Sequence, residues 1–162
     1  MISIRPADPA DAEVLLELVD ALADYEKLPR PDRAARERLI RDGFGAQPLF
    51  RAYLGEVDGV PVAYAITFHT YSSFLALPTL YLEDLFVLPD ARGQGVGGAL
   101  FRHLVGEALR QGCGRMEWVV LDWNRVAIDF YERHGARRLT EWYTYRLDRE
   151  RMLAMQEPEA AG

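Results

Sequence analysis

Residues 85–98 have the sequence LFVLPDARGQGVGG, and this stretch decides the fold class of the 162-residue chain. An apolar run ends at Pro89, a turn with four glycines follows, and Leu100, Leu104 and Ala108 then recur at helical spacing. Free amides at the beginning of a helix attract anions, and missing side chains let a phosphate approach the backbone. The stretch therefore predicts a strand, a phosphate-binding turn and a helix, in that order.

The glycine turn has competing interpretations. A Walker-type P-loop is excluded because no Lys-Ser or Lys-Thr follows the last glycine. The pattern Gly93-x-Gly95-x-x-Gly98 matches a dinucleotide-binding turn, with Asp122 after the next predicted strand. Such a domain needs several further strand-helix units, whereas only 40 residues follow Asp122. A turn without a ligand is a further alternative, although each glycine lowers helix stability by up to about 1 kcal/mol.

The flanking sequence predicts an α+β arrangement. The dipeptide Asp58-Gly59 is a strong hairpin signal. Apolar spacing predicts helices over residues 9–25 and 32–41, the latter ended by Gly43, then from the glycine turn to Gly112 and from Asn124 to Gly135. Predicted strands cover residues 2–5, 49–57, 60–70, 80–88 and 115–121, and a last pair covers 137–147. We therefore expect one domain over residues 1–156 with a mixed, mostly antiparallel sheet flanked by helices, and a disordered tail over 157–162.

Composition restricts the function. Apolar residues make up 49% and charged residues 27% of the chain, which is typical of a globular protein. The formal net charge of −6 disfavours a nucleic-acid partner and suits cationic substrates. The single Cys113 cannot form an internal disulfide, and no Cys/His spacing indicates a metal site. These features, and a start without signal-peptide character, predict a cytoplasmic protein. The charge-free stretch 59–82 alternates large and small side chains like a strand, so we expect no membrane partner.

Two motifs carry a resemblance to a known family. Arg92-x-x-Gly95-x-Gly97 directly follows the apolar run, and Asn124-x-x-Ala127-x-x-Phe130-Tyr131-x-x-x-Gly135-Ala136 lies downstream. Together they resemble the signature of the GNAT acetyltransferase superfamily, and the resemblance extends from Ile2 to about Leu147. Shorter segments are similar to the diamine (spermidine/spermine, thialysine) acetyltransferase branch: Tyr25-Glu26, Asp42-Gly43-Phe44-Gly45, Tyr81-Leu82-Glu83-Asp84 and Asp122-Trp123-Asn124.

The resemblance implies a GNAT fold, in which the central strands splay apart and the pantetheine of acetyl-CoA pairs with one of them. It implies acetyl-CoA as co-substrate and no metal, with cofactor contacts from Leu85, Phe86, Val87, Arg92, Gly93, Gln94, Gly95, Val96, Gly97, Gly98, Asn124 and Tyr131. It also implies a homodimer that pairs through C-terminal strands. The alternating aromatic segment 142–145 points to the same assembly.

Acetyl transfer to an amine requires a proton acceptor, because an amine with a pKa of about 10.4 is almost fully protonated near pH 7. Glu83 is the candidate catalytic base, and it adjoins Asp84 inside an apolar strand. Successive strand side chains face opposite ways, so at least one of the two carboxylates should face a covered side. The alternative is that both are solvated at the splayed end of the strand. In the diamine branch, the acid at the Glu83 position deprotonates the amine through water.

The remaining roles follow from the resemblance. Tyr131 would be the catalytic acid that protonates the departing CoA thiolate, although a tyrosine on an amphipathic helix is more often part of a core. Asn124 would contact CoA, and it also suits a helix cap. A backbone amide of strand 85–87 would polarise the thioester carbonyl. The acceptor amine would be bound by Tyr25, Glu26, Phe74, Glu83 and Asp84, and for Glu26 a solvated helix end is the alternative.

Two classes of function remain. The first is an N-acetyltransferase that moves an acetyl group from acetyl-CoA to a primary amine of a diamine, polyamine or basic amino acid by direct attack. The second is a non-catalytic GNAT module that binds acyl-CoA. The presence of Glu83 and Tyr131 in addition to the glycine turn favours the enzyme, because a binding module needs only the turn. A dinucleotide-dependent oxidoreductase is a distant third.

Overall fold

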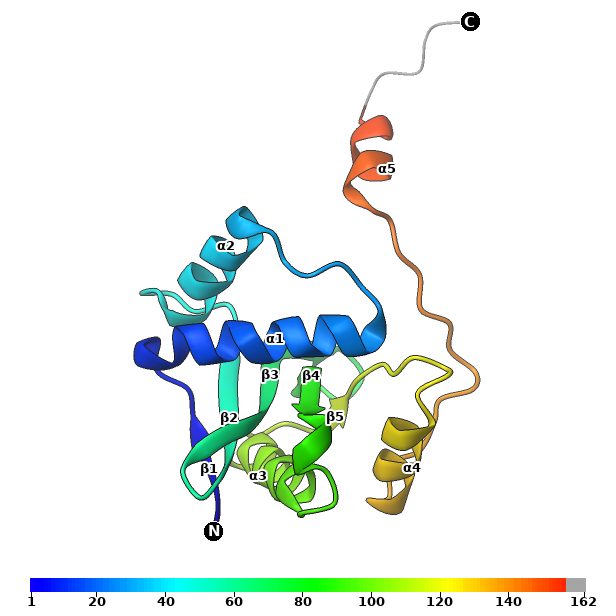
Figure 1. Cartoon of the computed structure of the whole chain (residues 1–162). Coiled ribbons are helices and arrows are strands. Elements are labelled where there is room, and N and C mark those ends of the chain that lie inside the picture. Colours follow the sequence, from blue (N-terminus) through cyan, green and yellow to red (C-terminus); the bar gives the residue numbers. More distant parts are fainter. Residues whose placement is uncertain (157–162) are drawn as a thin grey trace, which may run out of the picture. The chain divides into compact units, whose positions relative to one another are not determined.

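The computed structural model describes residues 1–156, and its elements follow one another as shown in Figure 1. They are β1 Ile2–Pro6, η1 Pro9–Asp11, α1 Ala12–Glu26, α2 Arg33–Phe44, β2 Arg51–Val57, β3 Val60–Ser72, β4 Leu77–Val87, η2 Pro89–Ala91, α3 Val96–Arg110, β5 Arg115–Glu117, α4 Arg125–Arg133 and α5 Arg149–Ala154. The chain divides into two compact units, one over Met1–Val119 and one from Val120 onward. The predicted tail over 157–162 lies outside the described residues, and a single domain over 1–156 stays a prediction.

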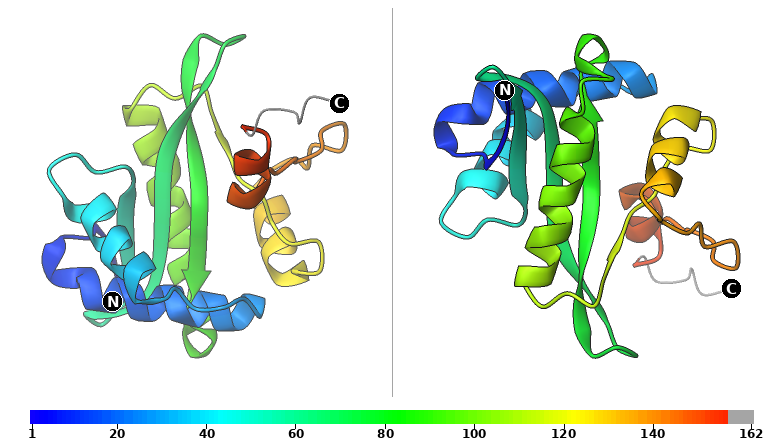
Figure 2. Two further views of the ribbon diagram at one scale, coloured as in Figure 1. Left: turned by 90° about the horizontal axis from the view of Figure 1, so that it is seen from above. Right: turned by 90° about the horizontal axis from the view of Figure 1, so that it is seen from below.

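The first unit contains a five-stranded sheet with the order β1-β2-β3-β4-β5. Neighbouring strands are antiparallel from β1 to β4, and β5 is parallel to β4. Helices α1 and α3 lie on opposite faces of this sheet (Figure 2). The prediction of an α+β fold with a mixed, mostly antiparallel sheet is therefore confirmed.

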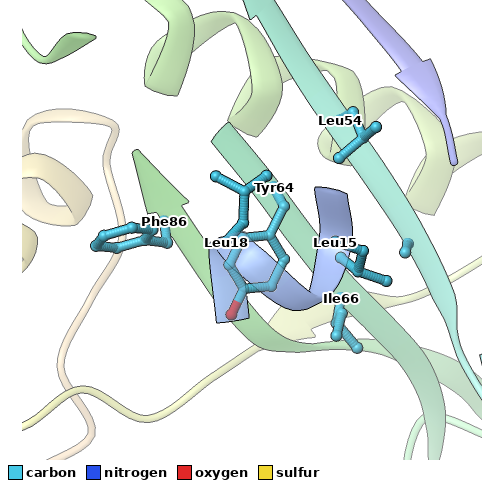
Figure 3. Close-up of a cluster of buried hydrophobic side chains, with 7 residues drawn as sticks. Leu15, Leu18, Leu54, Tyr64, Ile66 and Phe86 are labelled. Carbon is cyan, nitrogen blue, oxygen red and sulfur yellow. The ribbon is translucent and has the colours of Figure 1, made fainter. Parts of the chain in front are cut away.

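The hydrophobic core lies between α1 and the sheet. Leu15 and Leu18 of α1 pack against Leu54, Tyr64, Ile66 and Phe86, as Figure 3 shows. These strand residues share one face because side chains alternate along a strand. Each buried large apolar side chain contributes roughly 1.5–3 kcal/mol to folding. This packing holds α1 against the sheet, and at the end of the helix the ring of Tyr25 lies 6.0 Å from that of Phe86 of β4, between centroids, where the candidate site lies.

Local sequence explains the turns that frame the sheet. Asp58 and Gly59 have φ angles of 52° and 79°, so they form the predicted tight turn between β2 and β3. The prediction that α2 ends at Gly43 is wrong, because the helix continues to Phe44 and Gly45 is its cap. Gly43 serves packing instead. A Cβ atom there would lie 2.6 Å from the ring of Phe50, so a larger residue would require that ring to shift.

The predicted strand pair over residues 137–147 is also wrong, because the described chain has no strand in that range. Likewise, β5 ends at Glu117 instead of reaching residue 121. Alternating aromatic side chains supply the pattern of a strand, but a strand forms only where a neighbouring backbone accepts its hydrogen bonds. The second unit contains α4 and the unpredicted α5, whose N-cap Asp148 accepts a hydrogen bond from the amide of Arg151 at 2.9 Å.

Candidate functional site

The glycine turn leads directly into α3. Gly93 and Gly95 have φ angles of 78° and 91°, which only glycine adopts without strain, and Gly95 is the N-cap of the helix. A glycine cap has no side chain to bind the first amides of α3, so these donors are left for an anion. Val96 is buried and holds the first turn of α3 against the sheet. The turn therefore has the geometry of a phosphate site.

One edge of β4 is open beside this turn. β4 pairs with β5 only from Thr79↔Arg115 to Tyr81↔Glu117, so residues 82–87 have no described strand partner on that side. The amide of Leu88 donates to Val62 of β3 at 2.9 Å. Because backbone groups alternate along a strand, the N–H groups of Leu85 and Val87 point away from β3 toward the open edge. This is the splayed geometry that the sequence analysis expected, and it leaves backbone donors for an added extended group.

Arg92 connects the glycine turn to two other elements. Its Nε donates to the carbonyl oxygen of Val87 at 3.1 Å. Its guanidinium carbon lies 4.6 Å from the ring centroid of Tyr25 and 5.7 Å from that of Phe86. A guanidinium over an aromatic face is attracted by the electron density of the ring. The turn is thereby joined to the end of α1 and to the end of β4.

Carboxylates gather next to this junction. Asp84 is mostly buried, and the hydroxyl of Tyr64 donates a hydrogen bond to its Oδ2 at 3.1 Å. Burial raises the pKa of Asp84 to about 6, the bond from Tyr64 opposes the rise, and the charges of Glu83 and Glu26 add to it. Burial also raises the pKa of Glu26. A group of acidic side chains whose ionisation is penalised in this way attracts a cation.

Glu83 occupies a special position on β4. In the register of β3 and β4, Ile66 is paired with Asp84, and the next residue, Thr67, is paired with Leu82. Glu83 has no partner in this register and is therefore the extra residue of a β-bulge. Its side chain is exposed, whereas Asp84 is the carboxylate on the covered side. Bulges re-aim side chains and are frequent beside active sites. The bulge thus places two adjacent carboxylates in different environments.

The structure brings some predicted site residues together and separates others. One group forms at the end of α1, on β4 and at the start of the glycine turn, and its members are Tyr25, Glu26, Glu83, Asp84 and Arg92. Phe74 is almost fully exposed in the turn before β4. At about 3.3 Å per residue, the seven positions from Leu77 to Asp84 alone separate this turn from the group by roughly 23 Å. Within one chain, Phe74 is therefore not part of the group.

Asn124 and Tyr131 belong to the second unit and are described there. The Asn124 side chain accepts a hydrogen bond from the amide of Ala127 at 3.2 Å, so it caps α4 as the sequence predicts. Tyr131 lies on α4 with its ring edge-on to Phe130, at 5.4 Å between centroids. Gly135 follows the helix with a φ angle of 86°. The motif that carries these residues is thus a capped helix closed by glycine.

Tyr64 is the site residue that sequence reasoning missed. Its place in a large-small alternation marks it as a core residue, and its side chain is indeed fully buried. Its partner Asp84 is 20 residues away, and the two meet because β3 and β4 pair with Tyr64 opposite Phe86. Only the strand register reveals this contact, so the sequence held no direct signal for it.

Three further features were sought among residues 1–156: a metal site, a membrane-spanning helix and a reactive cysteine. Within that range, no group of His, Cys, Asp and Glu side chains has the arrangement of a metal site. The same range contains no helix with the length and apolar character needed to cross a membrane. Burial raises the pKa of the Cys113 thiol, which disfavours the thiolate form needed by a nucleophile.

Comparison with known proteins agrees with the geometry. The family described as "Acetyltransferase (GNAT) family" matches residues 15–136. The chain is 36% identical over 162 residues to thialysine N-epsilon-acetyltransferase from Sus scrofa, covering 93% of this chain and 95% of that protein. It is 32% identical to spermidine/spermine N(1)-acetyltransferase-like protein 1 from Homo sapiens, covering 94% of this chain and 23% of that protein. An integron cassette protein from V. cholerae shares the fold, with a TM-score of 0.82 and 21% identity over 97% of this chain and 98% of that one.

Proposed function

This chain belongs to the acetyltransferase (GNAT) family and is an N-acetyltransferase, and from that premise we propose that it moves an acetyl group from acetyl-CoA to a primary amine of a small cationic acceptor. The acceptor class is that of diamines, polyamines and basic amino acids. The main support for this proposal is the cluster of three carboxylates that Glu26, Glu83 and Asp84 form. Thialysine and spermidine/spermine appear in the names of the relatives, which is consistent with an amine that bears a second charge.

Charge selects the acceptor. Asp84 is mostly buried, and two further carboxylates raise the free energy of its ionised form. A cationic ammonium group in this place relieves both the burial penalty and the mutual repulsion. A neutral monoamine relieves neither. The far ammonium group of a diamine is therefore the part of the acceptor that we assign to Asp84 and Glu26.

The transfer step needs three groups from this chain. The amine nitrogen attacks the thioester carbon, so that a C–N bond forms and the C–S bond breaks. Glu83, exposed at the bulge, takes the amine proton through water. The resemblance to the family, rather than a contact in the structure, supports Tyr131 as the group that gives a proton to the departing thiolate. The backbone N–H of Leu85 at the open edge of β4 donates to the carbonyl oxygen as negative charge develops there.

The donor site is assigned to the turn and the open strand edge. The glycine turn supplies the amides at the start of α3 and conformational freedom for the pyrophosphate, and Leu85 and Val87 supply backbone groups for the pantetheine arm. A non-catalytic acyl-CoA module is the alternative function. It predicts acetyl-CoA binding without thiol release for any amine.

We also infer a cytoplasmic homodimer without nucleic-acid or membrane partners. The net charge of −6 and the single cysteine support the location and the absence of a nucleic-acid partner. The resemblance to diamine acetyltransferases supports the dimer. A monomer mass at micromolar concentration, measured by light scattering, would remove the dimer from this proposal.

The deciding experiment compares 1,4-diaminobutane with butylamine, which has the same chain length but one charge less. Release of CoA thiol gives kcat/KM for each amine at low and high salt. We expect the diamine to be at least about tenfold better at low salt and the difference to shrink at high salt, because salt screens the carboxylates. Glu26→Gln should reduce the preference, whereas Glu17→Gln, an exposed change on the same helix, should not. Equal efficiencies for the two amines in the wild-type protein would contradict the proposed acceptor class.

A further inference from the structure

Tyr64 is a fully buried tyrosine of β3 that neither the motifs nor the expected site include. Its ring packs in the core beside Phe86, at 6.4 Å between centroids, and its hydroxyl reaches Asp84. A phenylalanine would fill the same core space. The hydroxyl is therefore needed for something other than packing.

The Tyr64 hydroxyl donates a hydrogen bond to Oδ2 of Asp84 at 3.1 Å. Burial raises the pKa of Tyr64, and the charges of Asp84, Glu26 and Glu83 raise it further, so the phenol stays protonated and donates its hydrogen to Asp84. A donor fixed by a packed ring restricts the rotation of the carboxylate that it binds. One carboxylate oxygen of Asp84 is thus held by Tyr64, which leaves the other for a ligand.

We propose that Tyr64 is a positioning residue of the acceptor site, which orients the Asp84 carboxylate and keeps it ionised for a cationic amine. This inference rests on the proposed function in that Asp84 receives an ammonium group. It adds a specificity device from a third element of the fold, because Glu26 comes from α1, Asp84 from β4 and Tyr64 from β3.

The surroundings of Asp84 show why a fixed donor matters there. The charged groups that act on it are Glu83 on its own strand and Glu26 on α1, and both oppose its ionisation. From β3, Tyr64 is the group that favours the ionised form. Arg92 is engaged with Tyr25, Phe86 and the carbonyl of Val87. Without the Tyr64 hydroxyl, more Asp84 carries a proton near neutral pH and fewer molecules can bind a cation.

The test is Tyr64→Phe, with Tyr53→Phe as the matched control. Tyr53 is also a buried tyrosine, on β2, but its hydroxyl is not paired with the acceptor carboxylates. In the protein without substrate, NMR titration of the Asp84 carboxyl should show a pKa higher by about 0.5 to 1 in Tyr64→Phe and unchanged in Tyr53→Phe. Near pH 7, the KM for 1,4-diaminobutane should rise about five- to tenfold, while kcat and the KM for acetyl-CoA stay close to wild type.

A double-mutant cycle separates positioning from general loosening. In an Asp84→Asn background, Tyr64→Phe should have no further effect on the KM for the diamine, because the group through which it acts is gone. Equal Asp84 titrations in wild type and Tyr64→Phe, or additive effects in the cycle, would overturn the inference. A wild-type protein that acetylates no diamine would instead overturn the proposed function, and the NMR titration would still decide whether Tyr64 controls the charge of Asp84.

Discussion

The guanidinium of Arg92 lies over the ring of Tyr25, with its Cζ 4.6 Å from the ring centroid. Arg92 belongs to the glycine turn, and Tyr25 precedes Glu26 at the end of α1. The proposed donor site and the proposed acceptor site are thus in direct contact through one side chain. A substitution of Arg92 should therefore affect the binding of both acetyl-CoA and the acceptor amine.

Arg92→Lys keeps the charge but loses the planar group that stacks on Tyr25 and Phe86. We expect the free energy of unfolding to fall by about 1 kcal/mol, and the KM values for both acetyl-CoA and the diamine to rise. Arg102→Lys, an exposed change on α3, is the control. Urea denaturation and steady-state kinetics measure these effects. A change confined to the KM for acetyl-CoA would show that the contact with Tyr25 has no role in acceptor binding.

Asp84→Asn should stabilise the protein near neutral pH. The folded-state pKa of Asp84 is about 6, above the ordinary value of 3.8, so the folded chain binds more protons than the unfolded chain between these pH values. Stability therefore falls as pH rises through this window, by at most about 3 kcal/mol for this group. The variant should gain most of that amount at pH 7.5 and little at pH 4. A variant that is less stable than wild type at pH 7.5 in urea denaturation would contradict the assignment.

Gly95→Ala tests the phosphate site. Gly95 and Gly112 flank α3 with φ angles of 91° and 70°, so alanine at either position should lower stability by about 1 kcal/mol or more. Only Gly95→Ala should abolish the thermal shift that acetyl-CoA produces. In the wild type, acetyl-CoA at a hundred times its dissociation constant should stabilise by about 2.7 kcal/mol, and NADH should have no effect. Stabilisation by NADH alone would indicate a dinucleotide enzyme.

Glu83→Gln and Asp84→Asn should separate proton transfer from acceptor binding. Glu83 is exposed at the bulge, whereas Asp84 is partly buried and bound by the hydroxyl of Tyr64. We expect Glu83→Gln to lower kcat and to move the pH optimum upward, because the amine must then lose its proton without help. Asp84→Asn should chiefly raise the KM for the diamine. Kinetic pH profiles of both variants would show the reverse pattern if Asp84 is the base.

Tyr131→Phe should keep acetyl-CoA binding and lose turnover about a hundredfold, because only the proton donor for the thiolate is removed. Tyr145→Phe, in the C-terminal segment, should leave turnover unchanged. Single-turnover measurements with chemistry as the slow step provide the comparison. Full turnover by Tyr131→Phe over a broad pH range would assign Tyr131 to packing alone.

Local signals in the sequence accounted for most of the first unit and for the start of α4 in the second. The turn at Asp58-Gly59, the open glycine turn and the Asn124 cap depend on the conformations of a few adjacent residues, and the structure has all three. The same reasoning was wrong where the outcome depends on distant partners. Alternating aromatics over residues 142–145 predicted a strand, but side-chain alternation cannot supply a neighbouring backbone.

In the candidate site, too, some features depend on adjacent residues and others on distant partners. The sequence alone determined that acidic side chains interrupt an apolar strand just before a phosphate-binding turn, because both features lie within residues 83–98. Only the tertiary structure decided which carboxylate is buried. The bulge opposite Ile66 and Thr67 exposes Glu83 and turns Asp84 toward Tyr64, and this depends on how β3 and β4 are paired. A strand register is set by packing across the whole sheet, so the identity of the buried carboxylate cannot be derived from adjacent residues.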